Sequence, residues 1–427
     1  MTKFKVIGAK QLFGDINISG AKNSLLPLIC ASLLSRSVIL RNAPKLRDAE
    51  ILLDILSSIG ITGDWDPSGE VLYINAKQIG HDVKLLQGLV SSIRYSTILM
   101  GALIGAGCKK LEIAYPGGCS SFGTRPIDIH LVGFEALGAD ISILKNSIVI
   151  SCESLNKQVQ HTLRFPSVGA TLNLILASAA VEGSVTLHNI ATEPEVIDLI
   201  DFCVKLGFQF RFLKERSLEI TPPMSLRTAL LEHSVIPDRI ETLSFMVLGT
   251  LLCKDRLEIK GANIAHTKQP RDFLRSMGVP FDIFEDRIVV YRSEKLNARR
   301  LTVDVYPGIG TDYQPLIAAV MSYANGVSEI IDPVYPKRFA YLDELTKMGL
   351  QSTHLDGLAN IVGDPSLSVN GDFELECHDL RAGFNSLIFA LLNDGKTVLT
   401  KAEQILRGYY SVVDKLRSIG ADIETIN

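Results

Sequence analysis

The chain has 427 residues, of which 47% are hydrophobic and 21% are charged, and its formal net charge is -4. This length is enough for two to three domains with large cores, and the slightly acidic balance gives no support to nucleic-acid binding. The longest apolar runs, such as residues 25–34, are shorter than the ~20 residues that a membrane-spanning helix needs, and the N-terminus starts directly with strand-like alternation, so we expect a cytosolic protein.

In chain order, the first predicted elements are short strands, followed by an apolar helix that opens at Lys22. Five more apolar runs of this kind follow, each opened by a charged residue or a glycine: Arg94, Gly169, Arg239, Asp312 and Arg381. Successive openings lie 72, 75, 70, 73 and 69 residues apart. Such regular spacing indicates a sixfold internal repeat with several strands and two helices in each unit.

A second series of predicted helices runs in step with the first. Each is amphipathic, ends at a glycine and is followed by alternating, strand-like residues; the glycines are at positions 60, 138, 207, 278, 349 and 420. Glycine can adopt the left-handed conformation that ends a helix without a penalty from Cβ. Each repeat is therefore predicted to mix helices and strands.

The six repeats group most simply into two lobes of three. We expect one lobe at residues 22–235 and a second at residues 1–21 plus 236–427, with a chain crossing in the polar segment 233–241. The strands before Lys22 have no helix ahead of them. They are predicted to complete the second lobe, which brings the two termini together.

The helix openings favour an anionic substrate. A helix N-terminus presents unpaired N–H groups and a partial positive charge, so several buried helix starts make an anion site. The cations among the openings strengthen this preference.

Residues 115–130 form the least core-like segment of the first lobe. They contain three glycines and two prolines around Cys119, with Arg125 and Asp128 following. A cysteine in an exposed loop beside a cation can have a lowered pKa and become reactive. The alternative is a glycine-rich surface turn in which the cysteine is incidental.

Asp312 also has two readings. It follows two glycines and a proline at the start of an apolar run, where aspartate is a favoured helix cap. In a site rich in cations, its carboxylate can instead act as a base toward a hydroxyl. Asp379, Arg381 and Arg407 lie in short polar breaks between apolar runs. Each is either an ordinary surface residue or part of a functional site.

The sequence predicts no metal and no cofactor. Spaced carboxylates occur at positions 193, 195, 238 and 241, but His188 and His233 stand alone and form no ligand pattern. No glycine-rich dinucleotide or P-loop motif is present. Seven cysteines without a C-x-x-C pair argue against a disulfide framework, and Cys30, Cys203 and Cys253 are expected in the core.

Eight ordered motifs across the whole chain resemble the enolpyruvyl transferase family, in particular the members that use UDP-N-acetylglucosamine. They are AKNSLLP, PGGC with RPIDIH, FPSVGAT, TEPEVID, PDRIET, PG-x-x-TD-x-Q, DLRAG and RGY. The resemblance implies an α/β fold, the inside-out α/β barrel, with two lobes each of three βαβαββ repeats and with buried helices and outer sheets. It also implies transfer of the enolpyruvyl group of phosphoenolpyruvate to the 3-hydroxyl of UDP-N-acetylglucosamine with release of phosphate, an early step of peptidoglycan precursor synthesis.

The resemblance also assigns roles to residues of this chain. Lys22, Arg125 and Arg407 would hold phosphoenolpyruvate, Asp312 would take the proton of the acceptor hydroxyl, and Cys119 would act at the enolpyruvyl group and be alkylated by fosfomycin. The remaining substrate contacts implied by the resemblance are Asn23, Arg94, Pro126, Ile127, Asp128, Ser167, Val168, Gly169, Val334, Arg338, Asp379 and Arg381.

Three segments depart from the family pattern. The stretch between PGG and RP is one residue longer, so either Cys119 or Ser120 fills the catalytic slot; a thiolate is the better nucleophile near neutral pH, which favours Cys119. Gln404 and Leu406 replace a histidine and an aspartate beside Arg407, and PKRF replaces ENRF. These changes leave two alternatives: the same fold acting on another acceptor such as UMP, or a non-catalytic binding paralogue.

Overall fold

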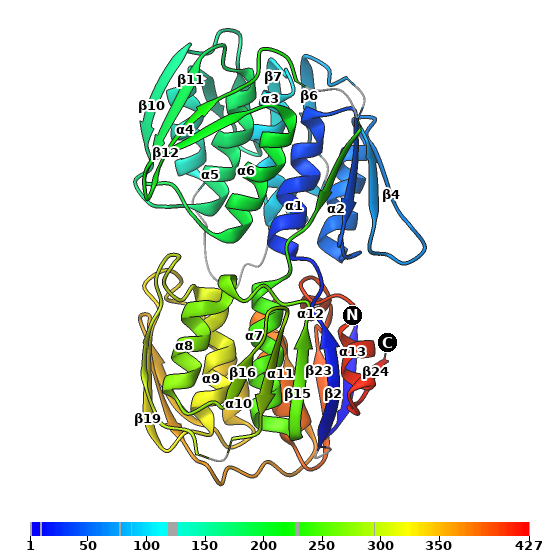
Figure 1. Ribbon diagram of the computed structural model, residues 1–427, viewed down its shortest axis with the longest axis vertical. Helices are drawn as coiled ribbons and strands as arrows, with labels where there is room; N and C mark the ends of the chain where they lie inside the picture. The colour runs from blue at the N-terminus through cyan, green and yellow to red at the C-terminus, as the bar shows by residue number, and fades with distance from the viewer. Residues whose placement is uncertain are drawn as a thin grey trace. The chain divides into compact units, whose positions relative to one another are not determined.

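The computed structural model describes residues 2–8, 11–76, 78–86, 88–117, 127–226, 230–293 and 295–426. The chain divides into two compact units. One holds most of residues 20–236 and is called the continuous unit below. The other holds residues 1–19 and 237–427 and is called the discontinuous unit. Figure 1 shows both units and labels their helices and strands where there is room.

The continuous unit contains three sheets of four strands among its described residues. In order of neighbouring strands they are β14 (Leu231–Ser234), β3 (Ser37–Arg41), β5 (Leu72–Asn75) and β4 (Thr62–Trp65); β6 (Asp82–Leu85), β7 (Lys110–Ala114), β9 (Ser147–Ser151) and β8 (Asp140–Ile143); and β10 (Gln158–Thr162), β11 (Ser184–His188), β13 (Ser217–Thr221) and β12 (Gln209–Lys214).

The described part of the discontinuous unit repeats this arrangement. Its sheets are β16 (Phe281–Ile283), β17 (Arg287–Tyr291), β15 (Cys253–Lys260) and β2 (Leu12–Asn17); β18 (Arg300–Thr302), β19 (Gly326–Ile331), β21 (Leu358–Gly363) and β20 (Gln351–Leu355); and β22 (Phe373–Glu376), β23 (Lys396–Thr400), β1 (Lys3–Ile7) and β24 (Asp422–Ile426).

All six sheets share one pairing pattern. In β6-β7-β9-β8, for example, β6 runs parallel to β7, while β9 runs antiparallel to both β7 and β8. Helices α3 and α4 alternate with these strands along the chain, which gives the predicted order βαβαββ. The predicted α/β repeat fold is confirmed.

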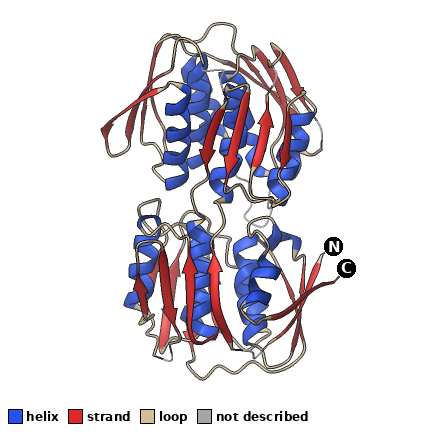
Figure 2. Cartoon of the chain, turned by 45° about the vertical axis from the view of Figure 1, so that its right-hand side comes forward, coloured by secondary structure: helices blue, strands red, loops and turns tan. Residues whose placement is uncertain are grey.

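Each unit contains helices that pack against one another and further helices around them. In chain order, the α-helices of the described chain are α1 (Lys22–Ala31), α2 (Arg47–Ser57), α3 (Leu99–Gly105), α4 (Asp128–Leu137), α5 (Val168–Ala177) and α6 (Pro194–Leu206), then α7 (Arg239–Leu252), α8 (Lys268–Ser276), α9 (Gln314–Ser322), α10 (Ala340–Thr346), α11 (Leu380–Leu392), α12 (Glu403–Leu406) and α13 (Val412–Ser418). Helices α1, α3 and α5 pack together, as do α7, α9 and α11. Nearly every residue of α1, α5, α9 and α11 is buried, as expected for helices that are apolar all round. Figure 2 shows helices inside each unit and strands around them.

The predicted glycine ends of the amphipathic helices are confirmed. Gly138 and Gly207 follow α4 and α6 with φ of 100° and 104°, and the other four glycines of the series also have positive φ. The cysteines expected in the core, Cys30, Cys203 and Cys253, are fully buried.

Strands from distant parts of the chain complete three of the sheets. β1 pairs with both β23 and β24, so Lys3 lies opposite Ile426. β2 pairs with β15 in the discontinuous unit, and β14 pairs with β3 in the continuous unit.

Two of the apolar runs start differently from the prediction. Arg94 opens a 3-10 helix, η3 (Arg94–Ile98), before α3 begins, and the Asp312 run starts with η7 (Thr311–Tyr313). In η3 the Ser96 and Thr97 hydroxyls donate to nearby backbone carbonyls, which competes with regular α-helical pairing. Within the described residues, no helix is both long enough and apolar enough to cross a membrane.

Candidate functional site

Lys22 is a buried cation at the first residue of α1. Its Nζ lies 2.7 Å from Asp48 Oδ2 on the first turn of α2, and the two side chains are only 6% and 2% exposed. A buried charge of this kind requires a partner. Asn23 follows Lys22 and is half-buried. The N-cap residue, Ala21, makes no side-chain cap bond.

The predicted nucleotide contacts of the continuous unit lie at the starts of α4, α5 and η3. Ser167 caps α5, its Oγ accepting from Ala170 N at 3.3 Å, and Val168 and Gly169 are the first residues of that helix. Ile127 is the N-cap residue of α4. Asp128 follows it and forms an ion pair with Arg164, which lies just ahead of the Ser167 turn. α5 packs against both α4 and η3, so these starts lie on neighbouring elements.

A buried amide joins these helix starts. Asn173 donates from Nδ2 to Thr97 O at 2.9 Å and to His130 Nδ1 at 2.7 Å, and its Oδ1 accepts from Gly101 N at 2.8 Å. Burial and the nearby charge of Arg94 lower the pKa of His130 to about 3. A neutral imidazole whose Nδ1 accepts must carry its hydrogen on Nε2.

We expect Gly169→Ala to destabilise the continuous unit, although alanine is normally the better helix former. A Cβ at this position would lie 3.0 Å from His130 Cε1 and 3.3 Å from its Nε2. Because Asn173 holds the ring, overpacking should lower the free energy of unfolding by about 1–2 kcal/mol. Urea titration followed by Trp65 fluorescence measures this. Gly88→Ala, which meets nothing within 4 Å, is the control, and an equal effect in both variants would contradict the steric argument.

In the discontinuous unit, Asp312, Arg338, Asp379 and Arg381 form one charged network. Arg338 donates from Nη1 to Asp312 Oδ1 at 2.8 Å and from Nη2 to Asp379 Oδ1 at 3.3 Å. Burial alone would lower the pKa of the Arg338 guanidinium, but Asp379 and Asp312 outweigh it and raise that pKa. The Asp312 side chain is 34% exposed, whereas Arg338 is 2% exposed.

The interpretation of Asp312 as a helix cap is wrong. Gly310 is the N-cap residue of η7, and Asp312 lies within that turn with its carboxylate on Arg338. The capping aspartates are Asp238 on α7 and Asp379 on α11, each accepting two backbone N–H bonds. Asp312 therefore has a carboxylate that is not used in capping and is accessible from solvent.

Arg381 is the most deeply buried cation of this network. Its Nε lies 3.7 Å from Asp312 Oδ2 and its Nη2 lies 3.9 Å from Asp238 Oδ2, with the side chain 0% exposed. Both of these carboxylates lie beyond direct hydrogen-bond distance of the guanidinium. The guanidinium lies 5.0 Å from the ring centre of Tyr409, whose hydroxyl is 2.8 Å from Ser244 Oγ. Burial raises the pKa of Tyr409 to about 12, so the ring stays neutral at neutral pH.

Arg407 and Val334 also belong to the discontinuous unit, and each has its own hydrogen-bond partner. Arg407 directly follows α12 and donates from Nη1 to Gln404 Oε1 at 3.1 Å. Gln404 is one of the residues that depart from the family pattern, so a neutral amide holds this cation. Val334 is held through its backbone N–H, which donates to Asp332 Oδ1 at 3.0 Å. Cys119, Ser120, Arg125 and Pro126 lie outside the described residues.

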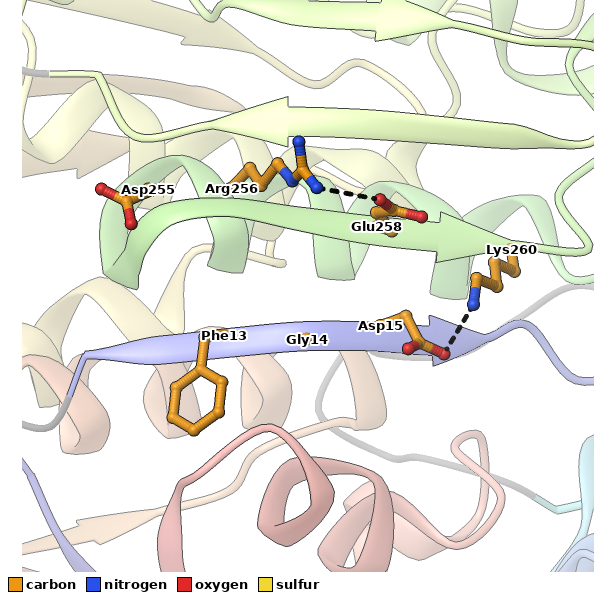
Figure 3. Close-up of a pocket in the computed structure, with 7 residues that line it drawn as sticks. All are labelled: Phe13, Gly14, Asp15, Asp255, Arg256, Glu258 and Lys260. Atoms are coloured by element: carbon orange, nitrogen blue, oxygen red, sulfur yellow. Dashed lines mark ion pairs between the residues drawn. The ribbon is translucent and has the colours of Figure 1, made fainter.

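A surface hollow elsewhere on the discontinuous unit contains none of these candidates. It lies over β2 and β15 and is lined by Phe13, Gly14, Asp15, Asp255, Arg256, Glu258 and Lys260 (Figure 3). Four of its charges pair with one another, Lys260 with Asp15 at 3.1 Å and Arg256 with Glu258 at 3.7 Å. Because these charges are compensated locally, the hollow is a poor candidate for an anion site.

Sequence reasoning missed one polar cluster. It treated His233 as isolated, but His233 Nε2 lies 2.8 Å from Asp198 Oδ1, and Ser24 Oγ donates to the other carboxylate oxygen. The three residues belong to different elements, so no local pattern predicts their contact. In the described parts of the chain, no group of three or more histidine, cysteine and carboxylate side chains is arranged to hold a metal.

Comparisons with known proteins agree with one another. Residues 6–416 match the family described as EPSP synthase (3-phosphoshikimate 1-carboxyvinyltransferase). The chain is 35% identical over 430 residues to UDP-N-acetylglucosamine 1-carboxyvinyltransferase of Lactobacillus johnsonii, covering 100% of both chains. It is 36% identical over 422 residues to UDP-N-acetylglucosamine 1-carboxyvinyltransferase 2 of Listeria monocytogenes, covering 99% of this chain and 97% of that protein.

Solved structures show the same fold. The enolpyruvyl transferase NikO from Streptomyces tendae matches with a TM-score of 0.90 and 25% identity, covering 100% of this chain and 99% of that one. EPSP synthase from Acinetobacter baumannii matches with a TM-score of 0.73 and 16% identity over 100% of both chains, a likeness that bears on the fold alone.

Proposed function

Because the chain belongs to the EPSP synthase family of carboxyvinyltransferases, we propose that it transfers the enolpyruvyl group of phosphoenolpyruvate to the 3-hydroxyl of UDP-N-acetylglucosamine and releases phosphate. The observation that carries this proposal is 34–36% identity over nearly the whole chain to relatives that bear this activity in their names. The role fits peptidoglycan precursor synthesis in the cytoplasm.

Asp312 is the base in this proposal. Its carboxylate is partly exposed and lies beside two buried cations, Arg338 and Arg381. Two neighbouring positive charges favour the ionised form, which is the form that accepts a proton. As the acceptor oxygen bonds to C2 of phosphoenolpyruvate, its proton passes to Asp312 and C3 takes up a proton; loss of a C3 proton then re-forms the double bond as the C2–O bond to phosphate breaks. General-base catalysis of this kind contributes about 10²–10⁴-fold in rate.

Cations serve the anionic groups of the substrates. Lys22, Arg125 and Arg407 hold phosphoenolpyruvate in this proposal, and fixed charges of this kind stabilise negative charge that develops as phosphate leaves. Arg381 is a further cation beside Asp312, and a guanidinium can bind an anion through paired N–H groups. Asp379 supports it by capping the helix that carries it.

The nucleotide sugar takes the remaining contacts. We assign it to Asn23, to the helix starts at Arg94, Ile127, Asp128 and Ser167 with Val168 and Gly169, to Pro126, and to Val334. A helix N-terminus attracts anions through its unpaired N–H groups, as a diphosphate requires. Cys119 acts at the enolpyruvyl group and is the proposed site of fosfomycin alkylation.

A second candidate function is transfer to another acceptor. The PKRF segment and the Gln404 contact with Arg407, both departures from the family pattern, support it. Because Gln404 stands where the family has a histidine, the environment of the phosphoenolpyruvate site differs from the family pattern in this chain.

Phosphate release from phosphoenolpyruvate tests both functions. The assay uses UDP-N-acetylglucosamine, UMP and no acceptor side by side, and a release-deficient Asp312→Asn variant as the background control. We expect release only with the nucleotide sugar. Release only with UMP would favour the second function, and no release with any acceptor, despite ligand binding, would contradict both.

A further inference from the structure

Three buried polar side chains meet in the continuous unit: Ser24, Asp198 and His233, which are 1%, 4% and 5% exposed. Ser24 Oγ donates to Asp198 Oδ2, and His233 Nε2 lies 2.8 Å from Asp198 Oδ1. An ionised carboxylate only accepts hydrogen bonds, so both neighbours are the donors. None of the three residues has a role in the reaction proposed above.

The carboxylate is the centre of this cluster. Asp198 Oδ2 also accepts from Ile236 N at 3.4 Å, so the buried carboxylate has three donors. His233, by contrast, has a buried Nδ1 without a hydrogen-bond partner in the described residues, and its ring packs edge-on against Phe202 at 5.5 Å. Asp198 is therefore what holds the imidazole, and removing it would leave several buried donors unsatisfied.

The cluster holds the start of α1 from two directions. Ser24 lies on the first turn of α1, two residues after Lys22. The carbonyl of Ile236, whose N–H points at Asp198, accepts from Ala21 N at 2.7 Å. Because Ala21 provides no side-chain cap, these contacts supply an anchor that the helix terminus itself lacks.

We propose that Asp198, with Ser24 and His233, is a positioning residue that sets the place of Lys22 and Asn23. Asp48 holds the Lys22 ammonium group, whereas Asp198 fixes the backbone from which that side chain extends. The inference rests on the proposed function, in which Lys22 binds phosphoenolpyruvate. A misplacement of about 1 Å in a catalytic group costs up to about 10²-fold in rate, which sets the size of the expected effect.

The test is a double-mutant cycle between Asp198 and Lys22, read as kcat/KM for phosphoenolpyruvate. We expect Asp198→Asn to lower kcat/KM by about 10- to 100-fold, with a cooperative thermal transition retained. In a Lys22→Gln background the same change should lower kcat/KM by less than about twofold, because the effects of coupled residues are not additive. Asp54→Asn, exposed on α2, is the control and should stay within about twofold of wild type.

A second pair of variants separates positioning from packing. His233→Gln keeps an N–H donor toward Asp198 and should stay close to wild type, whereas His233→Leu keeps the bulk but not the donor and should lose activity. If Asp198→Asn fails to fold, Ser24→Ala is the milder variant for the same cycle.

The outcomes are distinct. An equal loss from Asp198→Asn in both backgrounds would mean a general structural role, and no loss in either would mean no role; both overturn the inference while the proposed function stands. Full activity of Lys22→Gln would contradict the role of Lys22 in the proposed function and the inference with it.

Discussion

Replacing Asp312 by asparagine is expected to lower kcat for phosphate release by about 10²–10⁴-fold, because an amide cannot accept the hydroxyl proton. The nucleotide sugar should still bind with a Kd within about tenfold of wild type, since asparagine keeps an oxygen that can accept from Arg338 Nη1. Stopped-assay kinetics give kcat, and isothermal titration calorimetry gives the Kd.

Asp304→Asn is the matched control for this change. Asp304 is exposed in the same segment, and its carboxylate accepts only from Val305 N at 2.7 Å among the bonds in the described chain. It should retain wild-type kcat. A normal kcat in the Asp312 variant would exclude this residue as the base. An increase in the Kd for the nucleotide sugar far above tenfold would mean that its main role is binding.

Asn173→Ala is expected to give the largest loss of stability, about 3–5 kcal/mol in the free energy of unfolding of the continuous unit. The change removes three buried hydrogen bonds and leaves Gly101 N, Thr97 O and His130 Nδ1 without this partner. Each such orphaned group costs about 1–3 kcal/mol. Trp65 is the sole tryptophan of the chain and lies in this unit, so its fluorescence during urea titration reports the relevant transition.

Asn156→Ala provides the comparison in the same unit. Asn156 is exposed and donates from Nδ2 to Ala136 O at 3.2 Å, so its loss should change the free energy of unfolding by no more than about 0.5 kcal/mol. Similar losses in both variants would contradict the view that Asn173 joins the helix starts. If Asn173→Ala left the midpoint of the urea transition unchanged, that would contradict this view more strongly.

The repeat architecture was predictable because its signals are local. A helix end at Gly138 or Gly207 depends on one residue that tolerates positive φ, and this requirement is visible in the sequence alone. The family was predictable for a related reason, since eight ordered motifs survive along the chain. The start of the Arg94 run was not predictable, because the hydroxyl groups at positions 96 and 97 donate to the local backbone and produce a 3-10 turn.

The site was only partly predictable because its contacts are distant in the chain. Asp312 looked like a helix cap from its neighbours, and only folding brings it to Arg338, 26 residues away. His233 looked isolated because Asp198 lies 35 residues earlier on another element. Residue type and local spacing therefore identified candidate site residues. The side chains that contact them, and so determine their chemistry, are known only from the tertiary structure.

The pairing of β1 with β23 and β24 imposes an order on biosynthesis. These partners come from residues 396–426, so the sheet that contains β1 cannot form until those residues have been made. The continuous unit, by contrast, has all its described strands once residue 234 has been made. Because domains generally fold during synthesis from the N-terminal side and unpaired strand edges promote aggregation, the nascent chain carries an exposed N-terminal strand while its middle is already folded.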